Sequence, residues 1–308
     1  FASPKIGFRC VKESGTPAGD QGGFALSASG DVPSYAPASD AEFRQFAAHY
    51  EYAKTPLGAK VVETIESDAW TREKITYRGA NGKTVMAFLY LPKGAKRPLQ
   101  VIHFAPASDI VDGQRPLTHE LEEFLAPHIR AGRAAFGVIL EGYLERPFPT
   151  GWSPPAPESI EFVDDSVARV TDVRRGLDYL GTRPDIDMTR IAFFAPSAGS
   201  SFGVILTAVE PRYDAVFFIG GGLRASSAHR FHPAANRINF APHVRTPILM
   251  MHGRWDEVHP LKTNAEPLFK LLPEPKKLVV YDGGHMAPQS ILVPAVKTWL
   301  DGVLGAVR

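Results

Sequence analysis

The sequence predicts an α/β protein: a mostly parallel, doubly wound sheet that begins with an antiparallel hairpin and carries helices on both faces. From residue 99 onward, short apolar runs typical of buried strands alternate with amphipathic segments typical of helices. Before them, two alternating strands flank Asn81-Gly82, a dipeptide that favours a tight hairpin turn. Because alternating strands and helices require crossover connections, the strands of such a chain run parallel.

The chain before the hairpin divides into two parts. Residues 13–39 are rich in Gly, Ser, Ala, Pro and Asp without periodicity, so we expect residues 1–39 to be an N-terminal extension or linker. A helix over 40–54 follows, with Asp40 as its expected cap. Residues 40–308 are then expected to form one α/β domain.

The hairpin and the later elements follow from hydrophobic patterning. Alternation predicts the hairpin strands, and continuous apolar runs predict the buried strands that follow. In chain order, the elements are strands over 73–77, 84–91 and 99–104, a helix over 117–131, a strand over 134–140, a proline-rich loop over 147–157, a helix over 158–180 that ends near Gly181, strands over 191–195 and 215–219, a loop-rich stretch over 223–245, strands over 247–252 and 278–281, and a helix over 291–304.

Composition excludes several classes of protein. Hydrophobic residues make up 44% of the chain and charged residues 22%, as is ordinary for a globular domain. The net charge of +1 gives no electrostatic case for binding nucleic acid or an acidic membrane surface. No apolar run approaches the roughly 18–20 residues that span a bilayer. Cys10 is the single cysteine, so no intrachain disulfide can form and the redox compartment stays open.

The start of the chain bears on its origin. It begins at Phe1 without the basic-then-apolar pattern of a signal peptide, so we expect a processed product or a piece of a longer polypeptide. The compartment is undetermined, and a cytoplasmic location is the default. The oligomeric state is not predicted.

Ser197 stands at the centre of IAFFAPSAGSSFG, residues 191–203. An apolar strand, a turn of small residues and the start of a helix form the strand–turn–helix context of a nucleophile elbow. Such a turn is strained and aims the serine hydroxyl out of the sheet. The usual first glycine of the G-x-S-x-G pattern is Ala195 here, which weakens the motif, and a serine-rich helix cap is the alternative interpretation.

An acid and a histidine follow in the order that this kind of site requires. Asp256 comes after the strand over 247–252, and His285 after the strand over 278–281. Loops that follow parallel strands emerge at one edge of the sheet, so these side chains and Ser197 are expected to meet there. Serine needs an imidazole to take its proton and a carboxylate to fix the imidazole tautomer. The sequence therefore predicts a Ser–His–Asp triad.

Five stretches extend the pattern: YEYAKTPL (50–57), GRAAFGVILEGYLER (132–146), AVEPRYDAVFFIGGGL (208–223), INFAPHVRTPILMMHGRWD (238–256) and VVYDGGH (279–285). With the triad, they resemble α/β-hydrolases of the dienelactone-hydrolase-like and esterase branch, over roughly residues 40–308. The resemblance is strongest to a bacterial subgroup, the hydrolase domains found C-terminal in some serine/threonine protein kinase polypeptides. No kinase signature is present. IGFRCVK (6–12) resembles the last strand of formylglycine-generating-enzyme-like domains, and is too short to act alone.

The resemblance implies hydrolysis of a small-molecule carboxylic ester through an acyl-enzyme, without a metal, nucleotide or flavin cofactor. Ser197 would be the nucleophile, His285 the general base and Asp256 the acid that orients it. The N–H of Ala198 would be one oxyanion donor. The second would come from the loop after the strand over 99–104, where Pro106 has no N–H. We expect Ser108 to supply it, with Ala107, where related hydrolases carry glycine, as the second choice.

Other side chains at this edge are candidates for the substrate pocket or for structural roles. His103 either supports the site or is a buried, hydrogen-bonded histidine, His259 could reach the rim of the pocket, and His252 is expected to be structural. Tyr143, with Glu141 and Arg146, forms either a pocket wall or a salt-bridged scaffold. Aromatic side chains that could line or cap the site are Trp152, Phe231 and Phe240. His229 and His232 lack the further ligands that a metal site requires, so no metal is expected.

Two rival functions remain. An oligopeptidase would use the same triad on amides, but that class usually carries a large gating domain. A non-catalytic hydrolase-like module would sense ligands or act as a scaffold in a larger polypeptide, although the intact triad argues against it. We favour a serine carboxylesterase for short- to medium-chain esters.

Overall fold

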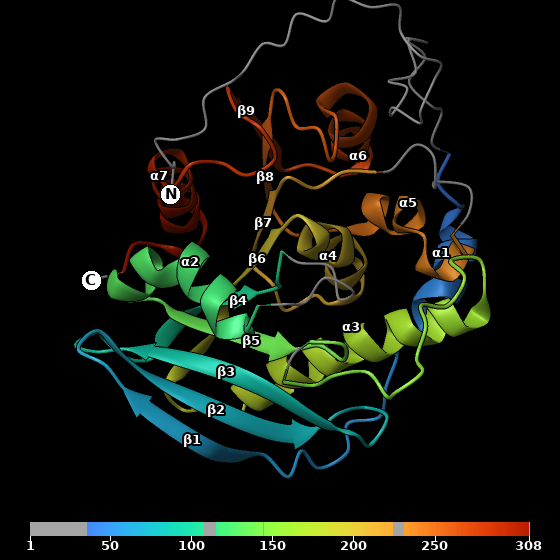
Figure 1. Ribbon diagram of the computed structural model, residues 1–308. Coiled ribbons are helices and arrows are strands. Elements are labelled where there is room, and N and C mark those ends of the chain that lie inside the picture. Colours follow the sequence, from blue (N-terminus) through green and yellow to red (C-terminus); the bar gives the residue numbers. More distant parts are fainter. Residues whose placement is uncertain (1–35, 108–114, 144, 224–230, 308) are drawn as a thin grey trace, which may run out of the picture. The chain divides into compact units, whose positions relative to one another are not determined.

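A computed structural model describes residues 36–107, 115–143, 145–223 and 231–307 (Figure 1). The predictions for the N-terminal extension therefore lie almost entirely outside the described residues. So do those for Ser108 and His229. Among the described residues, no helix is long and apolar enough to cross a bilayer.

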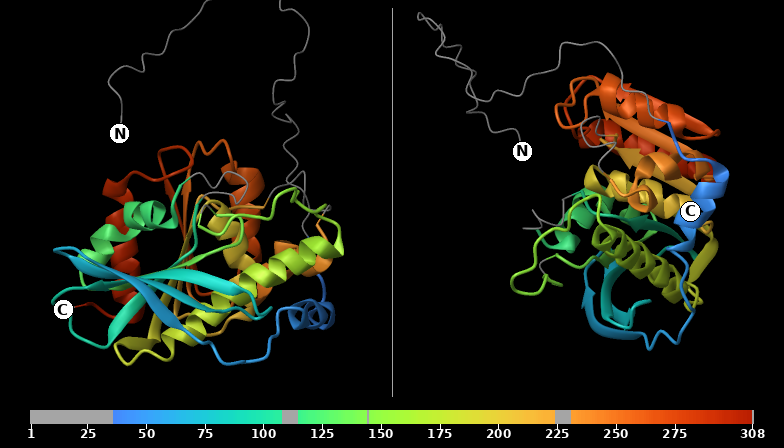
Figure 2. Two further views of the ribbon diagram at one scale, coloured as in Figure 1. Left: turned by 60° about the horizontal axis from the view of Figure 1, so that its bottom comes forward. Right: turned by 90° about the vertical axis from the view of Figure 1, so that its right-hand side faces the viewer.

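Within the described residues, one sheet of nine strands has the order β1-β2-β3-β5-β4-β6-β7-β8-β9. The strands are β1 (Lys60–Glu66), β2 (Trp70–Arg78), β3 (Thr84–Pro92), β4 (Leu99–Phe104), β5 (Ala134–Ile139), β6 (Ile186–Pro196), β7 (Ala215–Ile219), β8 (Ile248–Gly253) and β9 (Lys276–Tyr281). Pairing is antiparallel from β1 through β3 to β5, and parallel from β5 to β9. The antiparallel strands lie at the bottom of Figure 1 and in front in the left view of Figure 2.

Helices cover both faces of the parallel strands. They are α1 (Asp40–Ala48), α2 (Leu117–Arg130), α3 (Ile160–Leu180), α4 (Ala198–Val209), α5 (Arg237–Phe240), α6 (Glu266–Leu271) and α7 (Gln289–Leu304), with the short turns η2 (Pro233–Ala235), η3 (Ala241–His243) and η4 (Leu261–Ala265). Figure 1 shows α2 and α7 on one face of the sheet and α3, α4 and α6 on the other. This arrangement is the α/β-hydrolase fold, so the predicted fold class is confirmed.

Sequence patterning located most elements within a few residues. The hairpin turns at Gly82, whose φ of +81° suits glycine, and the Asn81 side chain accepts a hydrogen bond from the Lys83 N–H at 3.0 Å. The strand predicted over 99–104 has the bounds of β4. The helix predicted over 158–180 begins at Ile160 as α3, because the Ser159 side chain caps it by accepting from the Phe162 N–H.

The first helix begins at Asp40 as predicted, but its cap and its C-terminal end differ from the prediction. Ser39, not Asp40, is the N-cap: its side chain and that of Glu42 form a capping box. The helix ends at Ala48 rather than continuing to residue 54. Tyr50 just beyond it is fully buried, and its hydroxyl donates to the carbonyl of Ala234 at 2.8 Å, which requires the chain to leave the helical path.

The edge strand β1 and the helical turns between β8 and β9 were not predicted. β1 is exposed along its whole length at the edge of the sheet, so burial imposes no alternation of apolar and polar residues on it. Only its β-branched residues signal a strand. The crossover from β8 to β9 contains α6 and the π-helical turn η4, in a segment short enough to resemble a loop.

Candidate active site

Ser197 lies in a sharp turn between β6 and α4. Its φ of 46° is the only positive φ of a non-glycine residue among those described. Its N–H donates to the carbonyl of Ile219 on the neighbouring strand β7 at 2.7 Å, which holds the turn in place. A strained backbone maintained in this way is typical of functional sites. The elbow expected from the strand–turn–helix pattern is thus present in the structure.

Small residues let other backbone segments approach the elbow. A Cβ atom on Gly199 would lie 2.7 Å from the carbonyl oxygen of Pro106 and 2.9 Å from that of Ala105. A Cβ on Gly221 would lie 2.4 Å from the Cβ of Ser200. Ala195 is fully buried, and its carbonyl accepts the Ser200 hydroxyl at 2.5 Å. The fold therefore accommodates alanine in place of the first glycine of the pattern.

The three predicted triad residues meet at the carboxyl ends of β6, β8 and β9. His285 Nε2 lies 2.8 Å from Ser197 Oγ, and His285 Nδ1 lies 2.8 Å from Asp256 Oδ2. The His285 side chain is 22% exposed, whereas that of Asp256 is fully buried. The imidazole can therefore accept the serine proton at one nitrogen while the carboxylate binds the N–H of the other.

The carboxylate of Asp256 is surrounded by donors. Its Oδ1 accepts the backbone N–H groups of Val258 at 2.9 Å and His259 at 2.8 Å. Burial acts to raise the pKa of Asp256, but the hydrogen bonds from His285 and from the His259 backbone outweigh it, so the pKa lies below its usual value. The Asp256 carboxylate is thus held ionised beside the imidazole of His285.

His252 also reaches this carboxylate, which sequence reasoning missed. Its Nε2 lies 3.2 Å from Asp256 Oδ2 and 2.6 Å from the carbonyl oxygen of His259. The spacing of four residues between His252 and Asp256 was visible, but a tight loop at the end of β8 was needed to bring them together. The His259 side chain is buried, and its ring centroid lies 6.0 Å from that of His285.

The proposed oxyanion donors are engaged within the protein. The Ala198 N–H donates to the carbonyl of Ala107 at 3.3 Å. The Ala107 N–H donates to the buried carboxylate of Glu120, on α2, at 2.7 Å. Glu120 was not predicted, since a single acidic residue in the first turn of a helix is commonplace. In this conformation the N–H of Ala107 points to Glu120, and Ser108, the preferred second donor, lies outside the described residues.

The pocket candidates are dispersed. Tyr143 is buried and forms an isolated bridge with Arg146, whose guanidinium is paired with the buried Asp172 at 2.6 Å. This pairing favours the scaffold interpretation of the segment. Trp152 stacks on Phe148 with ring centroids 3.5 Å apart. Phe231 packs against Phe162 on α3.

Phe240 and His103 occupy core positions. Phe240 is fully buried and packs edge-on against Phe43 and Tyr50, next to α1. His103 is buried on β4, and its Nδ1 lies 2.8 Å from the hydroxyl of Tyr213. Both contacts anchor the core of the domain.

Buried neutral histidines should make the fold sensitive to acid. Burial, with a smaller effect of Arg212, lowers the pKa of His103 from 6.5 to about 3. Burial, with Arg133, lowers that of His128 to about 4. Below pH 6.5 the unfolded chain binds protons that the folded chain does not, so stability falls as the pH falls from 6.5 toward 4. Each group contributes up to about 1.4 kcal/mol per pH unit.

Urea unfolding between pH 7 and 4.5 measures this loss. The free energy of unfolding of the His128→Phe variant should depend less steeply on pH than that of the wild type, because one of the buried imidazoles is removed. A free energy of unfolding that is constant over this range would contradict the prediction.

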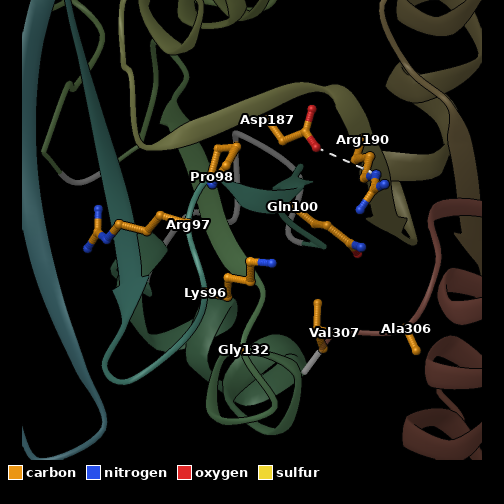
Figure 3. Close-up of a pocket in the computed structure, with 9 residues that line it drawn as sticks. All are labelled: Lys96, Arg97, Pro98, Gln100, Gly132, Asp187, Arg190, Ala306 and Val307. Carbon is orange, nitrogen blue, oxygen red and sulfur yellow. Dashed lines mark ion pairs between the residues drawn. The ribbon is translucent and has the colours of Figure 1, made fainter.

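A separate cavity of about 390 Å³ lies at the opposite edge of the sheet (Figure 3). It is lined by Lys96, Arg97 and Arg190 together with Asp187, which pairs with Arg190 at 3.5 Å. Most of its residues lie at or just before the amino ends of β4 and β6, with Gly132, Ala306 and Val307 completing the lining, whereas Ser197 follows the carboxyl end of β6. The cavity is therefore not part of the triad site. Among the described residues, no three His, Cys, Asp or Glu side chains are placed to hold a metal ion.

Solved structures share this fold at low sequence identity. No protein-family model matches the chain, and no curated protein does. An acetyl xylan esterase from Paenibacillus sp. R4 is 18% identical with a TM-score of 0.65, over 88% of this chain and 97% of that one. A glucuronoyl esterase from Solibacter usitatus is 17% identical with a TM-score of 0.56, over 85% and 92%. A cold-adapted esterase from an Arctic intertidal metagenomic library is 18% identical with a TM-score of 0.60, over 79% and 98%.

Proposed function

We propose that the protein is a serine carboxylesterase that hydrolyses short- to medium-chain esters through an acyl-enzyme. The observation that carries this proposal is the continuous hydrogen-bonded chain from Ser197 through His285 to Asp256, on a strained elbow at the ligand-binding edge of the sheet. Three of the solved structures that share the fold, the acetyl xylan esterase, the glucuronoyl esterase and the cold-adapted esterase, are named as esterases, which supports ester chemistry.

The geometry supports the following sequence of steps. Ser197 Oγ attacks the ester carbonyl while His285 Nε2 accepts its proton and then passes it to the leaving alcohol. Water repeats both steps on the acyl-enzyme. Asp256 binds the Nδ1–H and stabilises the imidazolium. The Ala198 N–H stabilises the oxyanion after the Ala107 carbonyl has moved away from it.

A fluorophosphonate probe tests the proposal directly. It should label the wild-type protein at Ser197, as identified by mass spectrometry of the labelled peptide. Absence of labelling would favour a non-catalytic hydrolase-like module. Labelling with turnover of peptide amides but not of p-nitrophenyl esters would favour the oligopeptidase alternative.

The acyl-chain preference should be limited. The candidate covering segments are the loop over 147–157, which contains the Phe148–Trp152 stack, and the stretch over 223–245. Neither segment is long enough to enclose a long acyl chain, so the far carbons of such a chain would remain in water. A buried CH₂ group contributes about 0.8 kcal/mol, or nearly fourfold in kcat/KM per carbon. We expect kcat/KM to rise from acetyl to about butyryl or hexanoyl esters.

Beyond that length kcat/KM should fall or become constant. A series of p-nitrophenyl esters measures it. A steady increase to dodecanoyl esters, or activation at an oil–water interface, would indicate a deep lidded pocket and contradict the prediction.

A further inference from the structure

His252 is buried at the end of β8, beside the acid of the triad. Its Nε2 faces two acceptors: the His259 carbonyl oxygen at 2.6 Å and Asp256 Oδ2 at 3.2 Å. Both are acceptors only, so Nε2 carries the hydrogen. It donates to the His259 carbonyl, and the polarised N–H lies beside Asp256 Oδ2. The same Oδ2 accepts the Nδ1–H of His285 at 2.8 Å, so one carboxylate oxygen lies next to the nitrogens of two imidazoles.

The other ring nitrogen fixes the state of His252. Its Nδ1 is buried and has no hydrogen-bond partner among the described residues. A proton there would be buried without an acceptor, which is unfavourable, so the ring is the neutral Nε2–H tautomer. Burial lowers the pKa of His252, partly opposed by the His259 carbonyl and Asp256. The ionisable groups that interact with the Asp256 carboxylate are His252, His285 and, from β9, Tyr281.

We propose that His252 is a positioning residue of the triad: its Nε2–H binds the His259 carbonyl, which holds the loop that carries Asp256, and lies close enough to Asp256 Oδ2 to stabilise part of its negative charge. The inference rests on the proposed serine hydrolase function. It assigns to His252 a role in setting the pH at which the base becomes active, in addition to holding the loop that carries Asp256.

The pH effect follows from the sharing of one carboxylate. With the Nε2–H of His252 removed, Asp256 interacts more strongly with protonated His285. The unprotonated base that catalysis needs then forms at higher pH, by roughly half to one pH unit for the loss of one polar contact to the carboxylate. The His259 carbonyl also loses its donor, so the loop holding Asp256 is less well fixed, and kcat should fall roughly tenfold.

Two substitutions separate this role from packing. His252→Phe keeps a ring of similar shape without a donor, and His252→Gln places an amide N–H near the position of Nε2. In His252→Phe the acid limb of the pH profile of kcat/KM should move to higher pH by roughly half to one pH unit. The value of kcat should fall roughly tenfold, and KM should be unchanged. His252→Gln should keep most of the wild-type kcat and an acid limb close to that of the wild type. His128→Phe is the matched control, since His128 is a buried histidine on α2 whose charged neighbours are Arg133, Asp301 and Lys297.

The control should lose stability without a shift of the acid limb. A His252→Phe enzyme with a lower Tm and an unchanged acid limb and kcat would overturn the proposal, because His252 would then be a core residue only. Should His252→Phe not fold, ¹⁵N NMR of the wild type gives an independent test. The His252 ring should be the neutral Nε2–H tautomer between about pH 7 and 8. The opposite tautomer, or titration in that range, would overturn it.

The NMR measurement needs no substrate. Its outcome is therefore distinguishable from failure of the proposed function, which would appear as absence of ester turnover and of probe labelling in the wild type.

Discussion

Replacing Ser197 by alanine is expected to reduce ester turnover by roughly a million-fold in kcat, since the nucleophile and base act as a unit. The free energy of unfolding should change by no more than about 1 kcal/mol, because only one hydroxyl at a partly exposed position is removed. Hydrolysis of p-nitrophenyl butyrate and urea unfolding measure the two quantities. Retention of most activity would refute the assignment of the nucleophile.

Ser201→Ala is the matched control for this substitution. Ser201 lies in the first turn of α4, and its N–H donates to the Ser197 carbonyl through the backbone, so its hydroxyl can be removed with little effect on activity. Ser200 is less suitable. It is fully buried, and its hydroxyl donates to the carbonyls of Ala195 and Ile219, so its loss would destabilise the elbow itself.

Asp256→Asn is expected to lower kcat by about four orders of magnitude. The amide NH₂ group can replace the oxygen that now faces His285 Nδ1, and this favours the tautomer with its proton on Nε2. That tautomer cannot accept the serine proton. Loss of the charge also removes the stabilisation of the imidazolium. Steady-state kinetics across pH 6–9, together with probe labelling of Ser197, measure the effect.

Asp282→Asn provides the comparison. Asp282 precedes His285 by three residues and is the acidic residue nearest to it in the sequence, but its carboxylate is 71% exposed and pairs with Arg254 at 2.8 Å. Its substitution should therefore leave turnover almost unchanged. A nearly silent Asp256→Asn combined with a damaging Asp282→Asn would reverse the assignment of the acid.

Most of the elements that hold the triad could be predicted because they are buried. β4, β6, β7 and β8 appear in the sequence as short apolar runs, and Ser197 and Asp256 each follow one of them. His285 follows β9, a half-buried edge strand whose apolar run over 278–281 was still visible. Their order fixed the sheet edge at which Ser197, Asp256 and His285 should meet. The elbow was recognisable because the turn requires small residues around one serine, although Ala195 departed from the expected pattern.

The contacts around the triad were less predictable, since they depend on tertiary packing rather than on local pattern. His252 reaches Asp256 only because the loop after β8 folds back on itself. Glu120 meets the Ala107 N–H across a sequence distance of 13 residues, where no local spacing indicates a contact. Phe240 was expected near the site as one aromatic in a loop-rich stretch, whereas its burial depends on the position of α1.

The Ala107 carbonyl gives the resting site a neutral substitute for the substrate oxygen. It already occupies the Ala198 N–H, so a ground-state ester carbonyl that displaces it exchanges one neutral acceptor for another and gains little binding free energy. A developing oxyanion accepts a stronger, charge-assisted hydrogen bond from the same donor. Under the proposed mechanism, the Ala198 N–H therefore stabilises the charged oxyanion much more than the neutral ester carbonyl. It contributes to kcat more than to substrate affinity, and neutral carbonyl inhibitors should draw little affinity from it.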